Sequence, residues 1–326
     1  MRAVVISRPG DPDVLVMRDV PVPEPGPGAV RVRVRAFGVN RADLLQRRGR
    51  YAAPSDVPSD IPGLEFAGEV DAVGAGPQPW AVHDRVMGIT GGGSYAEYVV
   101  VPATHAVRVP EGLTDVEAGA IPEVFVTAHD ALRRVGLGAG DWLLVHAVGS
   151  GVGVAALQLA KATGARVIGT SRTPDKLTRA AALALDVPVL TPSQDFVDAT
   201  LEATGGAGAN AALDLVGGAQ FPRTLEALAE RGRVALVGLT AGAVAEVNLG
   251  VILRRRLRIE GTVLRPRSAA EKAEAVAGFG ADVLPLLARG ALRPVIHAVL
   301  PFDAVAEAHR IMEANANFGK LVVEVR

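Results

Sequence analysis

The sequence has no cysteine among its 326 residues. Without a thiol the chain can form no disulfide, no thiolate nucleophile and no zinc site with cysteine ligands. Aromatic residues make up only 4% of the chain, and 34 basic residues nearly balance 35 acidic ones. A nucleic-acid surface depends on excess positive charge and on aromatic stacking, so the composition disfavours that class of partner.

Long apolar runs are also missing, since none reaches the length that a transmembrane helix needs. Met1-Arg2-Ala3 leads directly into strand-like sequence and does not resemble a signal peptide. These features predict a cytoplasmic protein with no membrane association. The length allows one large or two ordinary domains.

The clearest motif runs from Trp142 to Arg172, with the sequence WLLVHAVGSGVGVAALQLAKATGARVIGTSR. A short apolar run, a glycine turn, a helical pattern and a second apolar run predict one βαβ unit. Such a turn lets the backbone approach a diphosphate, and the helix start offers it free N–H groups. The predicted cofactor-binding residues of the turn are Ser150, Gly151, Val152 and Gly153.

The end of the second strand predicts which nicotinamide cofactor binds. NAD-specific folds place an acidic side chain there, whereas this chain has Ser171 and Arg172, with Lys176 shortly after. A hydroxyl and two cations can bind a 2′-phosphate, which favours NADPH. The alternative is that Arg172 and Lys176 are ordinary surface charges at a helix start.

The remaining chain predicts an α/β protein in two parts. The first part is rich in strands with alternating hydrophobicity and has one short helix, Arg41 to Arg47. The middle continues the βα alternation of a doubly wound parallel sheet, in which Gly217, Gly238 and Leu239 follow strand ends and join the cofactor site. We expect the C-terminal part to rejoin the first domain. The elements predicted after the motif are helix 175–184, strands 187–190, 211–216, 233–238 and 257–264, helix 269–289, strand 295–299, helix 304–314 and strand 320–325, and those before it are helices 113–120 and 124–135.

Several further motifs resemble the zinc-free quinone oxidoreductase branch of the medium-chain dehydrogenase/reductase superfamily, nearest to its p53-inducible group. The resemblance covers nearly the whole chain. It implies a Rossmann doubly wound parallel sheet (121–265) inserted in a β-rich, GroES-like catalytic domain (1–120 and 266–326). The motifs are NRADLLQ (40–46), GRY (49–51), PGLE (62–65), DRV (84–86), YAEYV (95–99), the turn 149–153 and EANANFGK (313–320).

The resemblance also implies the chemistry. Zinc alcohol dehydrogenases of this superfamily bind their metal through Cys, His and Cys, and matching those motifs places Asn40, Leu64 and Glu123 there, so no zinc is expected. The implied activity is NADPH-dependent hydride transfer to a quinone, a conjugated carbonyl whose charge delocalises.

Four catalytic residues are predicted in a cleft between the domains. Asn40, Asp43 and Tyr51 line it from the β-rich side, and Thr127 is similar to the family's contact to the nicotinamide ring. Tyr51 and Thr127 also count as cofactor-binding residues, as does Asn317 in the closing motif. Asn40 and Asp43 could instead form a helix N-cap, and Tyr51 could be a core aromatic.

Two residues outside this group are predicted to be structural. Glu65 needs buried partners such as Arg41 or a backbone N–H. His146, inside the central strand, is predicted to be a hydrogen-bonded core residue.

Two other functions stay open. Zinc-free enoyl-thioester and alkenal reductases of the superfamily are similar, and some use a tyrosine placed like Tyr51 as proton donor. A related branch serves as lens crystallin and is reported to bind RNA, which would make this a non-catalytic NADPH-binding protein. The resemblance further implies a homodimer formed through the strand region 257–264.

Overall fold

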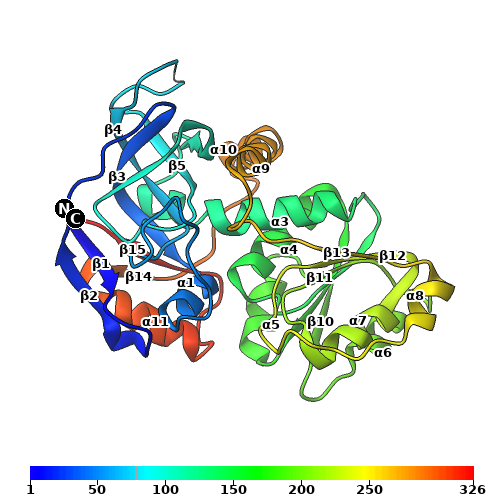
Figure 1. The fold of residues 1–326 in the computed structure, drawn as a ribbon. Coiled ribbons are helices and arrows are strands. Elements are labelled where there is room, and N and C mark those ends of the chain that lie inside the picture. The colour runs from blue at the N-terminus through cyan, green and yellow to red at the C-terminus, as the bar shows by residue number, and fades with distance from the viewer. Residues whose placement is uncertain (78) are drawn as a thin grey trace. The chain divides into compact units, whose positions relative to one another are not determined.

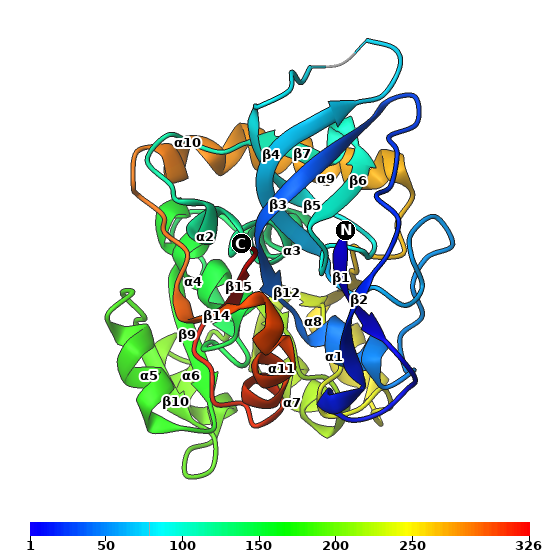
Figure 2. The ribbon, with the colours of Figure 1, turned by 90° about the vertical axis from the view of Figure 1, so that its left-hand side faces the viewer.

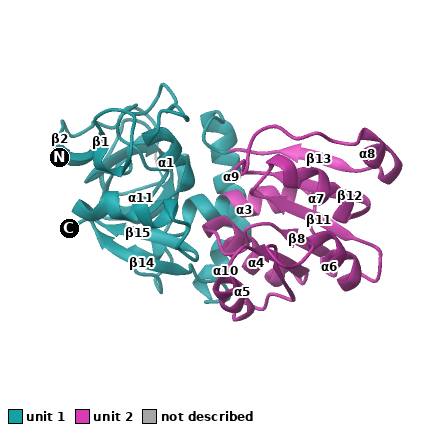
Figure 3. Ribbon diagram, turned by 90° about the horizontal axis from the view of Figure 1, so that it is seen from below, with its two compact units in different colours: residues 1–126, 264–326 teal, residues 127–263 magenta. Residues whose placement is uncertain are grey.

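A computed structural model describes residues 1–77 and 79–326. The chain divides into two compact units, 1–126 with 264–326 and 127–263 (Figure 3). The predicted return of the C-terminal part to the first domain is confirmed. The unit boundaries lie a few residues from the predicted 120/121 and 265/266, and the first of them falls within helix α3 (Pro122–Arg134).

Unit 1 is built on a seven-stranded sheet with the order β14-β15-β3-β4-β5-β7, and β6 also pairs with β3. The central strand β3 (Ala29–Val39) alternates valine with arginine at its start, which gives one buried and one wetter face. The other strands of this sheet are β4 (Glu65–Val73), β5 (Arg85–Ile89), β6 (Tyr98–Pro102), β7 (Ala106–Arg108), β14 (Ile296–Pro301) and β15 (Lys320–Glu324). β1 (Arg2–Ile6) and β2 (Leu15–Asp19) form a separate antiparallel pair.

The two chain ends meet within unit 1. β15 pairs antiparallel with β3, and the Arg2 side chain donates to the carbonyl of Arg326 at 2.6 Å. The termini lie side by side in Figure 1. Helix α11 (Val305–Glu313) packs against β15 and against α1 (Arg41–Arg47), as Figure 2 shows. The remaining helices of the unit are α2 (Asp115–Ala118), α9 (Ala269–Asp282) and α10 (Leu284–Ala288).

Unit 2 is a six-stranded parallel sheet with the order β10-β9-β8-β11-β12-β13. This order reverses between β8 and β11, where doubly wound folds bind their ligands. Its strands are β8 (Trp142–Val145), β9 (Arg166–Ser171), β10 (Val187–Leu190), β11 (Ala209–Asp214), β12 (Leu228–Leu236) and β13 (Arg258–Gly261), and its helices are α4 (Gly151–Thr163), α5 (Pro174–Ala181), α6 (Phe196–Ala203), α7 (Phe221–Ala227) and α8 (Leu249–Arg255).

The fold class is confirmed, whereas several predicted boundaries are wrong. The single helix predicted at 269–289 is two helices, because Pro285 cannot donate the N–H that a continuous helix needs there. Of the strand predicted at 257–264, only the four residues of β13 are a strand, and of the helix predicted at 113–120, only the four residues of α2 are helical. Among the described residues, no helix is long and apolar enough to cross a membrane.

Candidate active site

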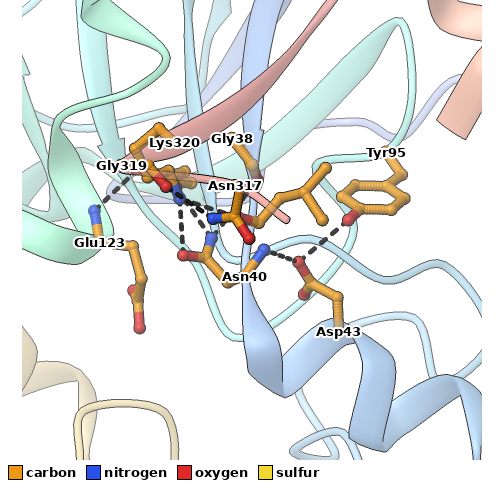
Figure 4. Close-up of polar contacts among 10 residues, drawn as sticks. Gly38, Asn40, Asp43, Tyr95, Glu123, Asn317, Gly319 and Lys320 are labelled. Atoms are coloured by element: carbon orange, nitrogen blue, oxygen red, sulfur yellow. Dashed lines mark hydrogen bonds and ion pairs between the residues drawn. The ribbon is translucent and has the colours of Figure 1, made fainter. Parts of the chain in front are cut away.

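Lys320 lies inside unit 1 and organises its polar cluster (Figure 4). The side chain is 3% exposed, and its ammonium donates to the Val39 carbonyl at 2.9 Å, to Asn40 Oδ1 at 2.7 Å and to Glu65 Oε1 at 2.6 Å. An ammonium has three N–H groups, so these acceptors use all of them. Lys320 is therefore a fixed internal cation with no donor left for a ligand.

Glu65 is the fully buried anion that pairs with Lys320. Its carboxylate also accepts from Asn40 Nδ2 at 2.8 Å and from the Glu123 backbone N–H at 2.9 Å. The predicted backbone partner is confirmed, whereas Arg41 as a partner is wrong. Arg41 is exposed at the start of α1 and donates to Asn315 Oδ1 at 2.8 Å.

Asn40 and Asp43 form part of the N-terminal cap of α1. Asp43 Oδ2 accepts the Asn40 backbone N–H at 2.8 Å, which is one half of a capping box. The Asn40 amide is occupied by Lys320 and Glu65, and both residues are buried. Asn40 and Asp43 therefore form the helix N-cap that was the alternative interpretation of this pair. Their contact with cofactor or substrate stays a prediction.

A directed chain of hydrogen bonds ends on Asp43. Arg47 Nη1 lies 3.1 Å from His309 Nδ1, and because a guanidinium only donates, that nitrogen must accept. Neutral His309 then carries its proton on Nε2 and donates to the Tyr95 oxygen at 3.1 Å, and Tyr95 donates to Asp43 Oδ2 at 3.0 Å. Burial, followed by the Arg47 charge, lowers the pKa of His309 to about 3, which keeps it neutral.

Asp43 itself is held in a poorly solvated position. Burial raises its pKa to about 6, opposed by the hydrogen bonds from Asn40 and Tyr95 and by the charges of Lys320 and Arg265. Its Oδ1 has no hydrogen-bond partner among the described residues. Sequence reasoning missed Arg47, Tyr95, His309 and Lys320 as members of this cluster, although Tyr95 and Lys320 belong to family-like motifs.

Tyr51 is partly exposed, and an arginine lies against its ring. The Arg265 guanidinium lies 4.9 Å from the ring centroid and is itself fixed by the Gly91 carbonyl at 2.7 Å and by Gln46 Oε1 at 2.6 Å. Burial raises the pKa of the Tyr51 hydroxyl. The ring is therefore positioned from one face, and the phenol is a weaker acid than a free tyrosine.

In unit 2 the glycine turn packs closely against the end of β8. Ser150 caps α4 by accepting the Gly153 N–H at 3.1 Å. A Cβ on Gly153 would lie 2.5 Å from the Ala147 carbonyl oxygen, so only glycine fits. The first N–H groups of a helix have no partner within it, and Gly151 and Val152 present theirs at this end. The turn fits the diphosphate of a dinucleotide.

The neighbouring turns at the same sheet edge are also shaped by glycine. Asp214 Oδ1 accepts the N–H groups of Val216 at 2.8 Å and of Gly217 at 2.9 Å, and Gly217 has a φ of 62°. A Cβ on Gly238 would lie 2.6 Å from the Leu215 carbonyl oxygen. Leu239 is 50% exposed. These turns and the turn 149–153 lie at the same edge of the sheet, near the point between β8 and β11 where the strand order reverses.

His146 is the core residue that the sequence predicted. It is fully buried, with Nδ1 at 3.1 Å from Thr170 Oγ1 and Nε2 at 2.9 Å from Thr224 Oγ1. Burial lowers its pKa to about 4. Its ring nitrogens are used within the core, which confirms the structural interpretation.

The residues predicted to read the 2′-phosphate follow β9. Ser171 Oγ both donates to the Thr173 carbonyl and accepts its N–H, each at 3.1 Å, so a phosphate would compete with this turn. Arg172 is exposed, and Lys176 lies in the first turn of α5. The geometry makes Arg172 the more accessible of these groups to a dianion.

The other two predicted cofactor residues have different settings. Thr127 lies in the middle of α3 and is partly exposed. Asn317 is buried, and its Nδ2 donates to the Gly319 carbonyl at 2.8 Å. Its amide nitrogen thus supports the chain before β15.

The positions that correspond to the zinc ligands of alcohol dehydrogenases have an unsuitable donor set. Leu64 offers only hydrocarbon and is 2% exposed, and Asn40 Oδ1 binds an ammonium. Glu123 is the one carboxyl among the three. Tetrahedral zinc needs several nitrogen, sulfur or carboxylate ligands, so these residues do not fit it. Within the described part of the chain, no three His, Cys, Asp or Glu side chains form a group that could hold a metal.

Comparisons with known proteins agree with this geometry. Residues 26–111 match the alcohol dehydrogenase GroES-like domain, and residues 151–284 match the zinc-binding dehydrogenase family. A quinone oxidoreductase from Pseudomonas aeruginosa is 34% identical over 96% of both chains. The chain belongs to the quinone oxidoreductases of the medium-chain dehydrogenase/reductase superfamily.

Solved structures of the superfamily superpose over the whole chain. Escherichia coli quinone oxidoreductase complexed with NADPH has a TM-score of 0.89 at 28% identity, covering 99% of this chain and 100% of that one. A protein described as an NAD-dependent alcohol dehydrogenase has a TM-score of 0.87 at 36% identity, with full coverage of both chains.

A further relative by sequence is a mycocerosic acid synthase-like polyketide synthase of Mycobacterium tuberculosis. It is 32% identical over 89% of this chain, which corresponds to 14% of that much longer protein.

We predict that Lys320→Met destabilises the protein by about 3–5 kcal/mol, since it leaves the buried Glu65 carboxylate without its cation. Urea unfolding measures the loss. Lys161→Met, which breaks the partly exposed pair with Asp186, should cost less than about 1 kcal/mol. Adding Glu65→Gln to Lys320→Met should recover part of the loss. Equal costs for the two single variants would contradict this assignment.

Proposed function

We propose that this protein is a zinc-independent reductase that transfers a hydride from NADPH to a quinone. The observation that carries the proposal is the full-length similarity to quinone oxidoreductases, which includes a structure complexed with NADPH. The glycine turn before α4 supports it, because that turn fits a diphosphate. A soluble cytoplasmic setting belongs to the same proposal.

Unit 2 would hold the cofactor through four sets of groups. The N–H groups of Gly151 and Val152 would bind the diphosphate, on a turn that the Ser150 cap and Gly153 keep in shape. Gly217, Gly238 and Leu239 would line the nicotinamide half, Thr127 would contact its ring, and Arg172 with Lys176 would bind the 2′-phosphate. When bound, NADPH supplies the hydride.

Unit 1 would contribute the polar side chains that orient the acceptor. Tyr51 offers a hydroxyl on a ring held by Arg265, and Asn40 and Asp43 are fixed by the Lys320 cluster. A quinone spreads the developing negative charge over its own ring. Positioning would therefore carry much of the catalysis.

The first test is steady-state oxidation of NADPH against 1,2- and 1,4-quinones, a crotonyl thioester and an alkenal, with wild type and Tyr51→Phe. We expect quinone turnover that survives the substitution within about tenfold, since the ring and its Arg265 contact remain. Absence of turnover with every acceptor, despite NADPH binding, would favour a non-catalytic binding protein.

An enoyl-thioester or alkenal reductase is the second candidate, favoured by the similarity to the polyketide synthase region. In that reaction Tyr51 would give its proton to the α-carbon. The same panel separates the candidates. Turnover of the thioester or alkenal alone, abolished by Tyr51→Phe, would replace the quinone proposal.

We predict that Arg172→Ala raises the KM for NADPH by about 10- to 100-fold and leaves the KM for NADH nearly unchanged. A charge-assisted hydrogen bond to the 2′-phosphate is worth roughly 1.5–3 kcal/mol, and only NADPH carries that group. Arg8→Ala, an exposed arginine of unit 1, is the matched control. An equal effect on both cofactors would contradict the assignment. The resemblance to an NAD-dependent enzyme makes the NADH arm essential.

We further propose a homodimer that forms along β13, the edge strand of the unit 2 sheet. An unpaired edge can add a strand from a second copy. Exposed apolar residues lie in the strand and in the preceding helix α8: Ile259 of β13 is 43% exposed, and Leu249 and Leu253 of α8 are 74% and 78% exposed. Such exposed apolar groups are typical of a contact surface.

Leu253→Asp should convert the dimer into a folded monomer of 33.6 kDa, as measured by light scattering after size-exclusion chromatography. The side chain is already exposed, so the fold should tolerate the charge. Val82→Asp, at an exposed apolar residue of unit 1, should leave the dimer intact. A dimer that persists in Leu253→Asp would place the interface elsewhere.

A further inference from the structure

Glu123 is anchored through its backbone, while its carboxyl is left out of the buried cluster. The residue is the second of α3, and its N–H donates to Glu65 Oε2 at 2.9 Å. Its side chain extends away from the Lys320 ammonium (Figure 4) and keeps part of its surface exposed. Within the described residues, no hydrogen bond to its carboxyl is formed. The anchoring therefore fixes where the carboxyl lies without neutralising it.

Within the part of the chain that the structure describes, neither neighbouring cation donates a hydrogen bond to the Glu123 carboxyl. Lys320 uses its three donors on Val39, Asn40 and Glu65, and Arg265 donates one hydrogen bond each to the Gly91 carbonyl, to Gln46 Oε1 and to the Tyr51 carbonyl. Glu65 presents a fully buried carboxylate whose Oε2 binds the Glu123 backbone. A second carboxylate beside it is unfavourable, so the Glu123 carboxyl favours its protonated form.

The groups around Glu123 act on its acidity in both directions. Burial is the largest cause, and it raises the pKa of Glu123 to about 8, helped by the carboxylates of Glu65 and Asp43. The cations Lys320 and Arg265 oppose that rise. Tyr51 is also within electrostatic reach, since the Glu123 charge contributes to raising the pKa of its phenol. At neutral pH these influences favour the protonated form of the Glu123 carboxyl.

We propose that Glu123 is the proton donor of the reduction, an inference that rests on the proposed function. It gives its proton to the carbonyl oxygen of the quinone as the hydride arrives. The carboxyl O–H bond breaks and the substrate O–H bond forms, while the hydride brings both electrons. Quinone and NADPH leave as hydroquinone and NADP⁺, and solvent returns a proton to Glu123.

Glu123 suits this role better than Tyr51 does. A general acid works best when its pKa lies near the working pH, and the phenol of Tyr51 is displaced upward from an already high value. Glu123 also precedes Thr127 by four residues on the same helix, which places both on one helical face. Thr127 is the residue proposed above to contact the nicotinamide ring. The acid and the ring contact would therefore share one rigid element.

The test compares wild type, Glu123→Gln and the exposed control Glu111→Gln, using the acceptor that wild type reduces fastest and a pH series from 6 to about 9.5. Wild type should lose kcat above about pH 8 as the donor ionises. Glu123→Gln should reduce kcat at pH 7 by about 10²-fold or more and remove the alkaline limb, with the Kd for NADPH unchanged. Glu111→Gln should match wild type.

A second readout does not depend on turnover. Between the ordinary glutamate pKa and about 8, the folded protein holds a proton that the unfolded chain has lost, so stability falls as pH rises. Glu123→Gln should remove that fall, and ¹³C NMR should show the wild-type carboxyl ionising near pH 8. These measurements answer the question even where the variant folds poorly.

The outcomes separate the donor role from the enzyme function. Quinone turnover in Glu123→Gln with the alkaline limb intact, or a wild-type carboxyl that ionises at an ordinary glutamate value, would overturn the donor role and leave the proposed function standing. A wild type that reduces no acceptor would overturn the proposed function and the donor role with it.

Discussion

The buried ion pair between Lys320 and Glu65 is the constraint on which unit 1 depends. Removing two opposite charges from water is costly unless every donor and acceptor is satisfied. Here the ammonium has three acceptors, and the carboxylate receives Lys320, the Asn40 amide and the Glu123 N–H. Because Lys320 begins the last strand and Glu65 begins β4, the pair joins the C-terminal strand to the N-terminal part of unit 1.

The same pair decides the state of the residues around it. Asn40 is held by both charges, and its backbone in turn holds Asp43 at the start of α1. Glu65 pairs with Lys320, whereas the Glu123 carboxyl receives no hydrogen bond within the described residues, so two neighbouring carboxyls have different environments. Environment, rather than residue type, thus separates a structural carboxylate from a candidate acid.

The structure of unit 2 depends on local sequence much more than the structure of unit 1 does. Its central strand, glycine turn and helix are contiguous in the sequence, and the close approach of Gly153 to the Ala147 carbonyl is set within a few residues. The parallel sheet then brings the turns after β8, β11 and β12 to one edge, because parallel strands end on the same side. The arrangement of these turns at one edge therefore needs little long-range information.

By itself the sequence determined the fold class, the family, the glycine turn before α4 and the core role of His146, since each depends on local pattern or on contiguous motifs. Only the tertiary structure decided the partner of Glu65 and the chain from Arg47 through His309 and Tyr95 to Asp43. Lys320 lies 255 residues from Glu65, and His309 lies 214 residues from Tyr95. Arg41 is not the cation that pairs with Glu65. That cation is Lys320, whose strand is distant in the sequence, and local sequence does not indicate which distant strand lies beside Glu65. Periodicity and propensity act over a few residues, whereas the acidity of a buried group is set by whatever the complete fold places against it.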